Sequence, residues 1–473
     1  MVKLTTSIKL LTILAAIQLA GCGTLAPTYS QPDAPVPLAW PEGPAYQSGL
    51  SSSAEVMVAE MGWREFFSDP NLKELIGLAL ENNRDLRQAA LNIERARAQY
   101  RIERAGLFPV VGASGGYSKQ RLPDTTGVGR TPTLEQYDVA LGSSSWEADF
   151  FGRVRSLKER ALEEYFASEE ARRAAQISLV AEVARGYLGL AADRELLDLA
   201  RQTLTSYQET YDLTQRRFEV GVASALEVRQ AQTSVDAARV DIARFTGLVA
   251  EDENAMRFLL GTSLPAELLP ATLTSVTALK EIPAGVPAAV LQHRPDILAA
   301  EHQLKGANAN IGAARAAFFP RIALTASAGF ASNELSNLFE SASKAWLFAP
   351  AVDLPIFTAG SLRARLKTSK VDREIALARY EGAIQSAFRE VADALAVRGT
   401  IDEQLDAQQS LVEATTATYR LSEARFSKGI DSFLNVLDSQ RSYYGAQQNL
   451  IGIRLARLTN QVTLYRVLGG GGV

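Results

Sequence analysis

The second half of this 473-residue chain repeats part of the first half, and this repeat constrains the fold more than any other feature. Nine residues between Tyr211 and Gln232 recur in the same order and spacing between Tyr419 and Gln440. They are Tyr211, Leu213, Arg217, Phe218, Gly221, Ser224, Leu226, Val228 and Gln232, which match Tyr419, Leu421, Arg425, Phe426, Gly429, Ser432, Leu434, Val436 and Gln440. A unit of roughly 200 residues is much longer than the solenoid repeats of about 20–50 residues. We therefore expect one domain that is present twice.

Each copy is predicted to contain a helix, a β-hairpin, a long helix and a returning helix. In the first copy the initial helical pattern runs from Pro70 to Phe108 and stops at Pro109, because proline disfavours helix in the residue before it. This copy is predicted to span residues 61–261, with a hairpin at 110–149 and helices at 153–219 and 224–260. The second is predicted to span residues 293–468, with a hairpin at 321–357 and helices at 361–427 and 432–468. Residues 262–292, which contain several prolines, are expected to connect the copies.

The long helices are expected to pack laterally against other helices. At 1.5 Å per residue each would extend for about 100 Å, which an isolated helix in a globular protein does not do. In the first long helix apolar residues recur every seven positions, at Val183, Leu190, Leu197, Leu204, Tyr211 and Phe218. A sustained heptad pattern predicts coiled-coil packing. In the second long helix Arg398 interrupts the same pattern.

The N-terminus has the pattern of an exported protein. A basic start and a short apolar run precede Leu19-Ala20-Gly21-Cys22, which predicts a signal peptide at residues 1–21. The sequence Leu-Ala-Gly-Cys resembles the lipobox of bacterial lipoproteins, which implies that Cys22, the only cysteine, carries lipid. Gly23 in place of Asp implies, by the same resemblance, that the protein does not stay in the inner membrane. Residues 22–60 are rich in proline and are expected to form a lipidated tether, and residues 469–473 a tail.

The four predicted strands point to a membrane protein that is completed by other copies of the chain. No apolar run reaches the ~20 residues of a transmembrane helix, whereas the strands approach the ~9–11 residues of a membrane strand. Single-chain barrels start at about eight strands. An open sheet edge in lipid would leave backbone groups unpaired at several kcal/mol each. We therefore expect a multimer that forms one shared β-barrel, whose number of chains the sequence leaves open.

Four sequence motifs resemble the outer-membrane efflux proteins, in the lipoprotein branch of the TolC-like family. They are the segments 63–72, 83–86, 292–297 and 307–320, which read WREFFSDPNL, NRDL, QHRPDI and ANANIGAARAAFFP. The resemblance implies a mixed α/β membrane protein of mainly long α-helices. Three chains would form an α-helical periplasmic tunnel continuous with a shared twelve-stranded barrel, to which each chain gives four strands.

The same resemblance implies a function. Members of this family are passive exit ducts of tripartite efflux pumps, and they work with a periplasmic adaptor (membrane fusion) protein and an inner-membrane RND-type transporter. The implied location is the outer membrane, with a lipid anchor and a large periplasmic part. A gate would lie at the periplasmic end. The cargo and the identity of the pump are not fixed by the sequence.

The turns between the long and returning helices are candidate docking sites. The residues concerned are Arg217, Phe218, Gly221, Val222 and Ser224 in the first copy, and Arg425, Phe426, Gly429, Ile430 and Ser432 in the second. Turn chemistry explains part of this pattern, since glycine accepts a positive φ and Ser224 with Glu227 forms a capping-box pattern. The family resemblance implies that these tips also face the adaptor.

Candidate gate residues occur in the second copy only. Asp431 and Asp438 stand where the first copy has Ala223 and Gln230. Around a symmetry axis these acids would form rings, and rings of Asp select cations in pores. The alternative is that Asp431 caps a helix and Asp438 is a solvated surface acid. Arg441, one turn beyond Asp438, is a candidate partner for an acid in the closed state.

Nothing in the sequence indicates an enzyme. His293 and His302 lack metal-ligand spacing, and no nucleophile elbow, P-loop or dinucleotide motif is present, so we expect no metal, no cofactor and no catalysis. The formal net charge of −4, with mixed signs throughout, argues against nucleic acid as a partner. Two alternatives to the pump duct are a type I secretion duct and a structural periplasmic lipoprotein scaffold without a pore.

Overall fold

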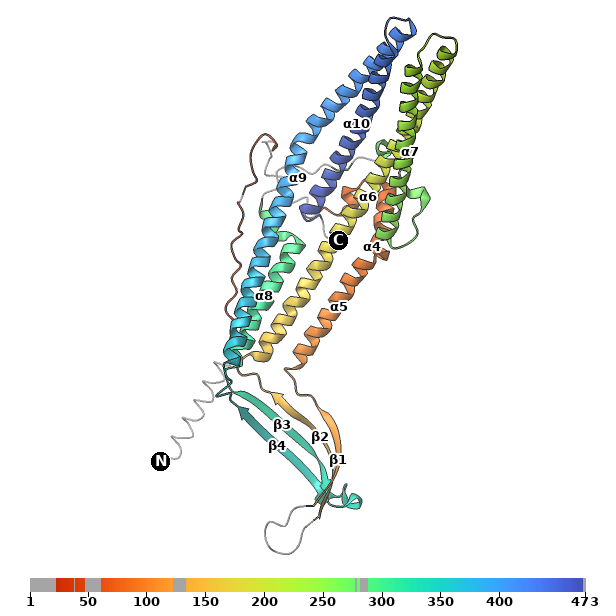
Figure 1. The fold of residues 1–473 in the computed structure, drawn as a ribbon. Coiled ribbons are helices and arrows are strands. Elements are labelled where there is room, and N and C mark those ends of the chain that lie inside the picture. The colour runs from red at the N-terminus through yellow and green to blue at the C-terminus, as the bar shows by residue number, and fades with distance from the viewer. Residues whose placement is uncertain are drawn as a thin grey trace. The chain divides into compact units, whose positions relative to one another are not determined.

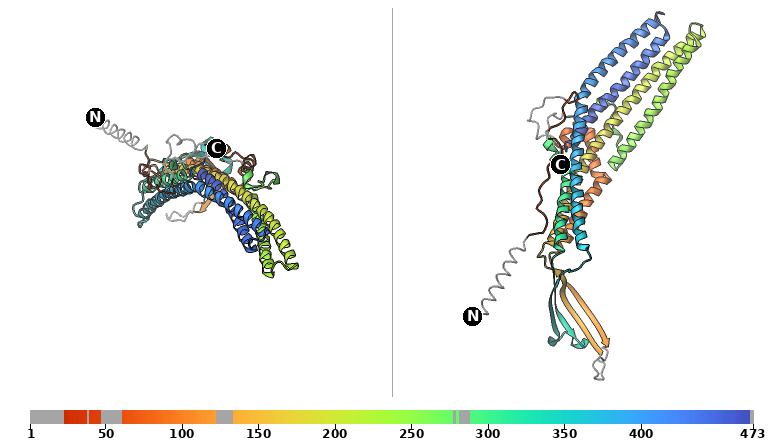
Figure 2. Two further views of the ribbon diagram at one scale, coloured as in Figure 1. Left: turned by 90° about the horizontal axis from the view of Figure 1, so that it is seen from above. Right: turned by 60° about the vertical axis from the view of Figure 1, so that its left-hand side comes forward.

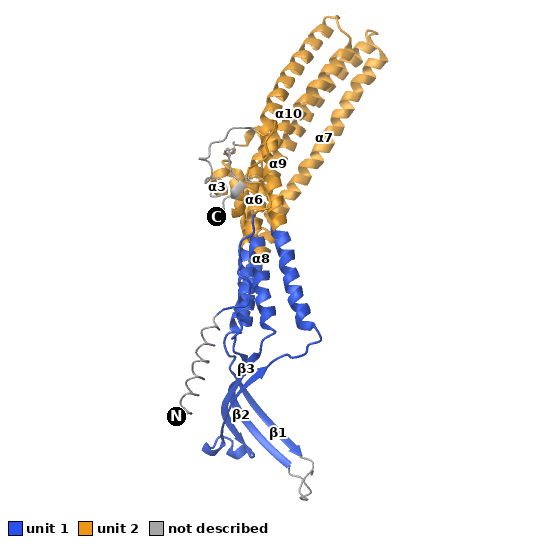
Figure 3. Ribbon diagram, turned by 90° about the vertical axis from the view of Figure 1, so that its left-hand side faces the viewer, with its two compact units in different colours: residues 1–33, 92–169, 299–380 blue, residues 34–91, 170–298, 381–473 orange. Residues whose placement is uncertain are grey.

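The computed structural model describes residues 23–37, 39–46, 61–121, 133–276, 279–280 and 288–470. The predicted signal peptide and Cys22 lie outside these residues, as does much of the predicted tether. The chain forms two compact units (Figure 3). The first contains residues 1–33, 92–169 and 299–380, and the second contains residues 34–91, 170–298 and 381–473. Neither unit is one copy of the repeat, because each combines matching parts of both copies.

The first unit contains a four-stranded antiparallel sheet in the order β1-β2-β3-β4 (Figure 1). The strands are β1 (Gly112–Arg121), β2 (Thr133–Glu147), β3 (Arg321–Ser332) and β4 (Lys344–Asp353). The two predicted hairpins pair internally, and β2 pairs with β3, which joins the copies in one sheet. Among the described residues β1 pairs with β2 and β4 pairs with β3, so each has one hydrogen-bonded neighbour and both edges of this sheet are open in the single chain.

Long helices carry the chain from one unit into the other. They are α6 (Arg153–Glu219) and α9 (Ser361–Ser427), which return as α7 (Ala225–Leu260) and α10 (Phe433–Val467). Shorter helices precede the strands: α5 (Arg84–Ala105) before β1 and α8 (Pro295–Ala316) before β3. None of the described helices combines the length and the hydrophobicity that a membrane-spanning helix requires.

The first predicted helix is interrupted at Asn83. Two helices replace the expected continuous one, α4 (Pro70–Asn82) and α5, and a short helix α3 (Trp63–Phe66) precedes them. The Asn83 Oδ1 atom accepts a hydrogen bond from the backbone N–H of Leu86 at 2.9 Å, while its Nδ2 donates to the carbonyl of Leu259 at 2.9 Å. An asparagine that caps the following helix adopts non-helical backbone angles, and this separates the two helices.

In the second unit heptad residues of α6 are buried, and those from Leu197 onward pack on the returning helix α7. Val183 and Leu190 are fully buried, and Leu197 packs on Phe245 of α7. Further along, Tyr207 packs with Val235 and Ala238. The two helical hairpins lie side by side (Figure 1, Figure 2) and meet in a cluster of Ala231, Phe433, Val436 and Leu437, with Tyr211, Tyr419 and Phe426 around it. The predicted lateral packing of the first long helix on other helices is thus present, except that Phe218 at its end is 42% exposed.

Part of the segment predicted as a tether is bound to the body of the first unit. The carbonyl oxygens of Leu25 and Pro27 accept hydrogen bonds from Arg315 (3.0 Å) and Asn308 (2.7 Å), both on α8. The hydroxyl of Tyr29 donates to Glu301 at 3.1 Å. This segment carries no regular secondary structure, so side chains of the helix satisfy its backbone carbonyls.

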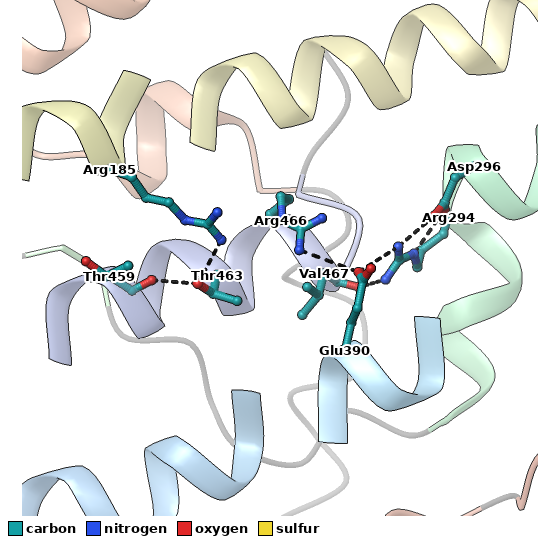
Figure 4. A network of polar contacts seen from close by, with 8 residues as sticks. All are labelled: Arg185, Arg294, Asp296, Glu390, Thr459, Thr463, Arg466 and Val467. Carbon is teal, nitrogen blue, oxygen red and sulfur yellow. Dashed lines mark hydrogen bonds and ion pairs between the residues drawn. The ribbon is translucent and has the colours of Figure 1, made fainter. Parts of the chain in front are cut away.

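A polar network fixes the start of α8 in the second unit (Figure 4). The Arg294 guanidinium donates to both carboxylate oxygens of Asp296 (3.0 and 2.7 Å), to Glu390 of α9 (3.2 Å) and to the carbonyl of Val467 at the end of α10 (2.8 Å). Arg466 lies 3.5 Å from the same Glu390 carboxylate. The Arg-Pro-Asp motif therefore does more than start a helix, since its arginine ties together three helices.

Candidate functional site

The first tip is a tight turn between α6 and α7. Gly221 has φ +77°, and the backbone N–H groups of Val222 and Ala223 donate to the carbonyl of Arg217 at 2.8 and 3.2 Å. This pattern closes the end of α6 around a residue in the left-handed region, which glycine adopts without strain.

The start of α7 at this tip is a reciprocal cap. The Ser224 Oγ atom accepts from the N–H of Glu227 at 3.2 Å, and the Glu227 carboxylate accepts from the N–H of Ser224 at 2.6 Å. The capping box predicted from the sequence is confirmed. It orders the turn on the α7 side.

The second tip has the same backbone turn but a different polar contact. Gly429 has φ +72°, and the N–H of Ile430 donates to the carbonyl of Arg425 at 3.0 Å. Ser432 is at the cap position of α10 but makes no side-chain cap. Instead the Arg425 guanidinium donates to both oxygens of Asp431, at 2.6 and 3.1 Å, and lowers the pKa of this carboxyl. Asp431 is thus the partner of Arg425 across the turn.

The equivalent arginine of the first copy makes a different contact. Ala223 stands in the place of Asp431, so Arg217 has no carboxylate across its own turn. Its guanidinium carbon lies 4.6 Å from the ring centroid of Phe426 in the second copy. Phe426 also packs against Phe433, with ring centroids 5.4 Å apart. This cation–π contact links the two tips, whereas Arg425 pairs with Asp431 within its own tip.

Both tips present apolar side chains to solvent. Val220 is 73% exposed, Val222 66% and Ile430 59%, and Leu226 and Leu434 just beyond the turns are also exposed. The side chains predicted to dock therefore divide into two groups. Phe218, Val222 and Ile430 are exposed, whereas Phe426 is half-buried between the hairpins.

Asp438 and Arg441 are exposed on α10, two turns and more from the second tip. The Arg441 Nη2 atom lies 3.2 Å from the hydroxyl of Thr233 and 3.4 Å from that of Ser234, both on α7. In this chain the arginine thus reaches hydroxyl groups of the other copy rather than the expected carboxylate. Thr233 occupies the repeat position equivalent to Arg441, so equivalent positions of the two copies face each other here.

A buried polar contact beside these residues was missed by sequence reasoning. Gln440 is 4% exposed, and its Nε2 lies 3.2 Å from the Ser206 hydroxyl of α6 and 3.4 Å from the Tyr419 hydroxyl of α9. It borders a cavity of about 140 Å³ lined by four tyrosines, Tyr207, Tyr419, Tyr443 and Tyr444. Gln440 is one of the nine repeated residues, so the repeat singles it out without revealing its partners.

Comparison with known proteins settles the family. The sequence profile of the outer membrane efflux proteins matches residues 75–262 and 286–470, one match in each copy. The chain belongs to the outer membrane efflux protein family. It is 53% identical to a toluene efflux pump outer membrane protein, TtgC of Pseudomonas putida, over 99% of this chain and 96% of the relative. It is 39% identical to SilC of Salmonella typhimurium, a probable outer membrane lipoprotein, over 98% of this chain and 99% of that protein.

The fold has solved counterparts. The open state of the MtrE outer membrane channel of Neisseria gonorrhoeae superposes with a TM-score of 0.85 at 39% identity, covering 95% of this chain and 98% of that one. The predicted fold class, with long helices and four strands per chain of a trimeric tunnel and barrel, is confirmed. This efflux protein is a channel of the outer membrane and not an enzyme. Channels of this family work as trimers within tripartite pumps.

Proposed function

We propose that this chain is the exit duct of an RND-type pump, that a periplasmic adaptor docks on its two tips, and that Asp431, Asp438 and Arg441 control its periplasmic end. The observation that carries the proposal is the set of exposed apolar side chains on ordered turns, Val220, Val222 and Ile430 among them. Exposed apolar patches with polar surroundings mark protein–protein contacts. The adaptor would bury these side chains and contact both tips at the same time.

The docking proposal predicts the effect of changing the tip glycines. Replacing Gly221 and Gly429 with tryptophan should reduce in-cell crosslinking of the trimer to its adaptor at least tenfold. At φ +77° and +72° a side chain strains each turn by about 1–2 kcal/mol and displaces the exposed residues beside it. Nothing lies within 4 Å of a Cβ atom at either position, so the helices keep their packing.

The matched control is Gly247→Trp on α7, where the backbone is helical and a Cβ atom also meets nothing within 4 Å. This variant should crosslink as the wild type does, and all variants should remain SDS-resistant trimers. Crosslinking that persists in the double variant would refute docking at the tips.

We also propose that Cys22 carries the lipid anchor. The support is the Leu-Ala-Gly-Cys sequence together with 39% identity to a protein named as a lipoprotein. Mass spectrometry of the mature N-terminal peptide should show a diacylglyceryl group on Cys22, and Cys22→Ser should remove it. An unmodified Cys22 in the mature protein would contradict lipidation without affecting the duct proposal.

The cargo proposed for this duct is small organic compounds. Relatives 47–53% identical are named as toluene, solvent or antibiotic efflux proteins of Pseudomonas putida. Deleting this chain should sensitise its host to toluene and to hydrophobic antibiotics, and unchanged tolerance to both would contradict this cargo class. A type I secretion role has no comparable support.

A further inference from the structure

The first unit contains a cavity of about 340 Å³ at one end of the sheet. Its lining includes charged and aromatic side chains: Glu147, Asp149, Arg153, Arg321 and Asp353 together with Phe150, Phe151 and Phe319. A volume of this size falls within the range of about 300–1,000 Å³ of small-molecule sites. Neither the docking tips nor the gate candidates contribute to it.

One side of the cavity is positively charged. The carboxylate of Glu147 is only 10% exposed and is held by two guanidinium groups. Arg153 donates to both of its oxygens at 2.9 and 2.7 Å, and the Nε of Arg321 lies 2.9 Å from the second oxygen. Two arginines for one carboxylate leave one positive charge in excess. The Arg321 side chain is 54% exposed, so its terminal amino groups can reach an incoming anion.

Beside these arginines the lining also carries a negative charge. Asp353 is the register partner of Arg321 in the β3–β4 ladder, and its side chain is exposed. Residues directly opposite each other in an antiparallel pair lie about 4.5–5.5 Å apart between Cβ atoms. Asp149, the other acid of the lining, already accepts hydrogen bonds from the backbone N–H (2.9 Å) and the Nε (3.2 Å) of Arg155. Asp353 is therefore the carboxylate that a bound cation would meet.

Exposed apolar residues lie on the chain segments that adjoin the same end of the sheet, and two of them, Phe150 and Phe319, line the cavity. In the antiparallel order, the start of β1, the end of β2, the start of β3 and the end of β4 lie at one end of the sheet. The adjoining segments carry an apolar collar, whose members and exposures are Phe108 (61%), Val110 (79%), Phe150 (42%), Phe319 (43%), Ile356 (92%) and Phe357 (88%). Aromatic residues of membrane proteins concentrate at the membrane–water interface. An apolar collar of this kind is expected at the level of lipid head groups.

We propose that this cavity binds the head group of a zwitterionic phospholipid of the phosphatidylethanolamine type. The phosphate would lie at Arg321 and Arg153, since guanidinium groups match phosphate geometry and charge. The ammonium group would lie at Asp353, and the glycerol and upper acyl chains along Phe150 and Phe319. A site with one pole of each sign favours a zwitterion over a lipid that carries net negative charge.

The test is lipid retention by the full-length trimer. The purified channel is equilibrated with micelles containing equal amounts of phosphatidylethanolamine and phosphatidylglycerol, and native mass spectrometry counts the lipids that remain. The wild type should retain phosphatidylethanolamine at up to one molecule per chain and several-fold more of it than of phosphatidylglycerol. Arg321→Gln should reduce this retention about tenfold, while Lys344→Gln, at the opposite end of β4, should leave it unchanged.

Charge reversal keeps the proposal testable if Arg321→Gln fails to form trimers. Asp353 is exposed, so Asp353→Lys should leave trimers intact and invert the preference toward phosphatidylglycerol. Equal retention of the two lipids by the wild type would overturn the proposal, as would a phosphatidylethanolamine preference that survives Asp353→Lys.

Discussion

Replacing Arg294 with alanine is expected to destabilise the helical body of each chain by about 3 kcal/mol. Arg294 is 6% exposed, and its guanidinium binds Asp296, Glu390 and the carbonyl of Val467. Its removal would leave the Val467 carbonyl without this donor and Glu390 with only the more distant Arg466. The cost of unpaired polar groups exceeds the value of the bonds themselves, because the groups stay partly out of water.

Thermal unfolding of the detergent-solubilised trimer, followed by circular dichroism, measures this effect. Arg294→Ala should lower the midpoint of unfolding by several degrees. The midpoint of Arg294→Lys should fall between those of Arg294→Ala and the wild type, since lysine keeps the charge but cannot donate the paired hydrogen bonds of a planar guanidinium group. Arg229→Ala is the control, because Arg229 is exposed and donates to Gln232 on its own helix. A midpoint equal to that of the wild type in Arg294→Ala would show that the network in Figure 4 contributes nothing to stability.

Replacing Arg441 with alanine is expected to raise the open probability of the channel several-fold. Its side chain joins α10 of the second copy to Thr233 and Ser234 of the first. A hydrogen bond from a charged group contributes about 1.5–3 kcal/mol when shielded. Arg441 is exposed, so we expect its hydrogen bonds to contribute about 1.5 kcal/mol or less to the closed state. Since 1.4 kcal/mol corresponds to a tenfold change in the equilibrium between closed and open states, the open probability should rise several-fold.

Asp438→Asn should lower the preference of the channel for cations, as expected if Asp438 forms a ring of carboxylates.

Single-channel recordings separate these two effects, because open probability and reversal potential are measured independently. Arg239→Ala is the matched control for Arg441→Ala, since Arg239 is exposed on α7 and pairs with Asp236 of its own helix. An open probability that Arg441→Ala leaves unchanged would show that the contact between α7 and α10 does not hold the closed state.

The elements with local signals could be predicted from the sequence. The prolines before each hairpin marked the ends of α5 and α8 to within three residues, since these helices end at Ala105 and Ala316 and turns with i→i−3 hydrogen bonds lead on to Pro109 and Pro320. By contrast, α6 and α9 cover the residues expected of them. The tip turns followed from Gly221 and Gly429, whose positive φ values explain why glycine is repeated there. The break at Asn83 has a local cause as well, but a capping asparagine within a helical pattern is hard to distinguish from an ordinary surface residue.

Contacts between distant segments could not be predicted. The Arg425–Asp431 pair spans a turn, so no helical periodicity indicates it, although the repeat did single out Asp431 as a difference between copies. Arg441 donates to hydroxyl groups of the other copy because the two helical hairpins pack side by side. A single sequence does not show which faces of the helices of the two hairpins contact each other. For the same reason, the sequence alone does not show that each compact unit combines parts of both copies of the repeat.

If this chain forms the conducting duct of an efflux pump, the purified wild-type trimer should carry current in planar lipid bilayers. We expect discrete, cation-preferring openings that are rare in the wild type and frequent in Arg441→Ala. Bilayers that contain folded trimers of both proteins and carry no current would contradict a role as the conducting duct.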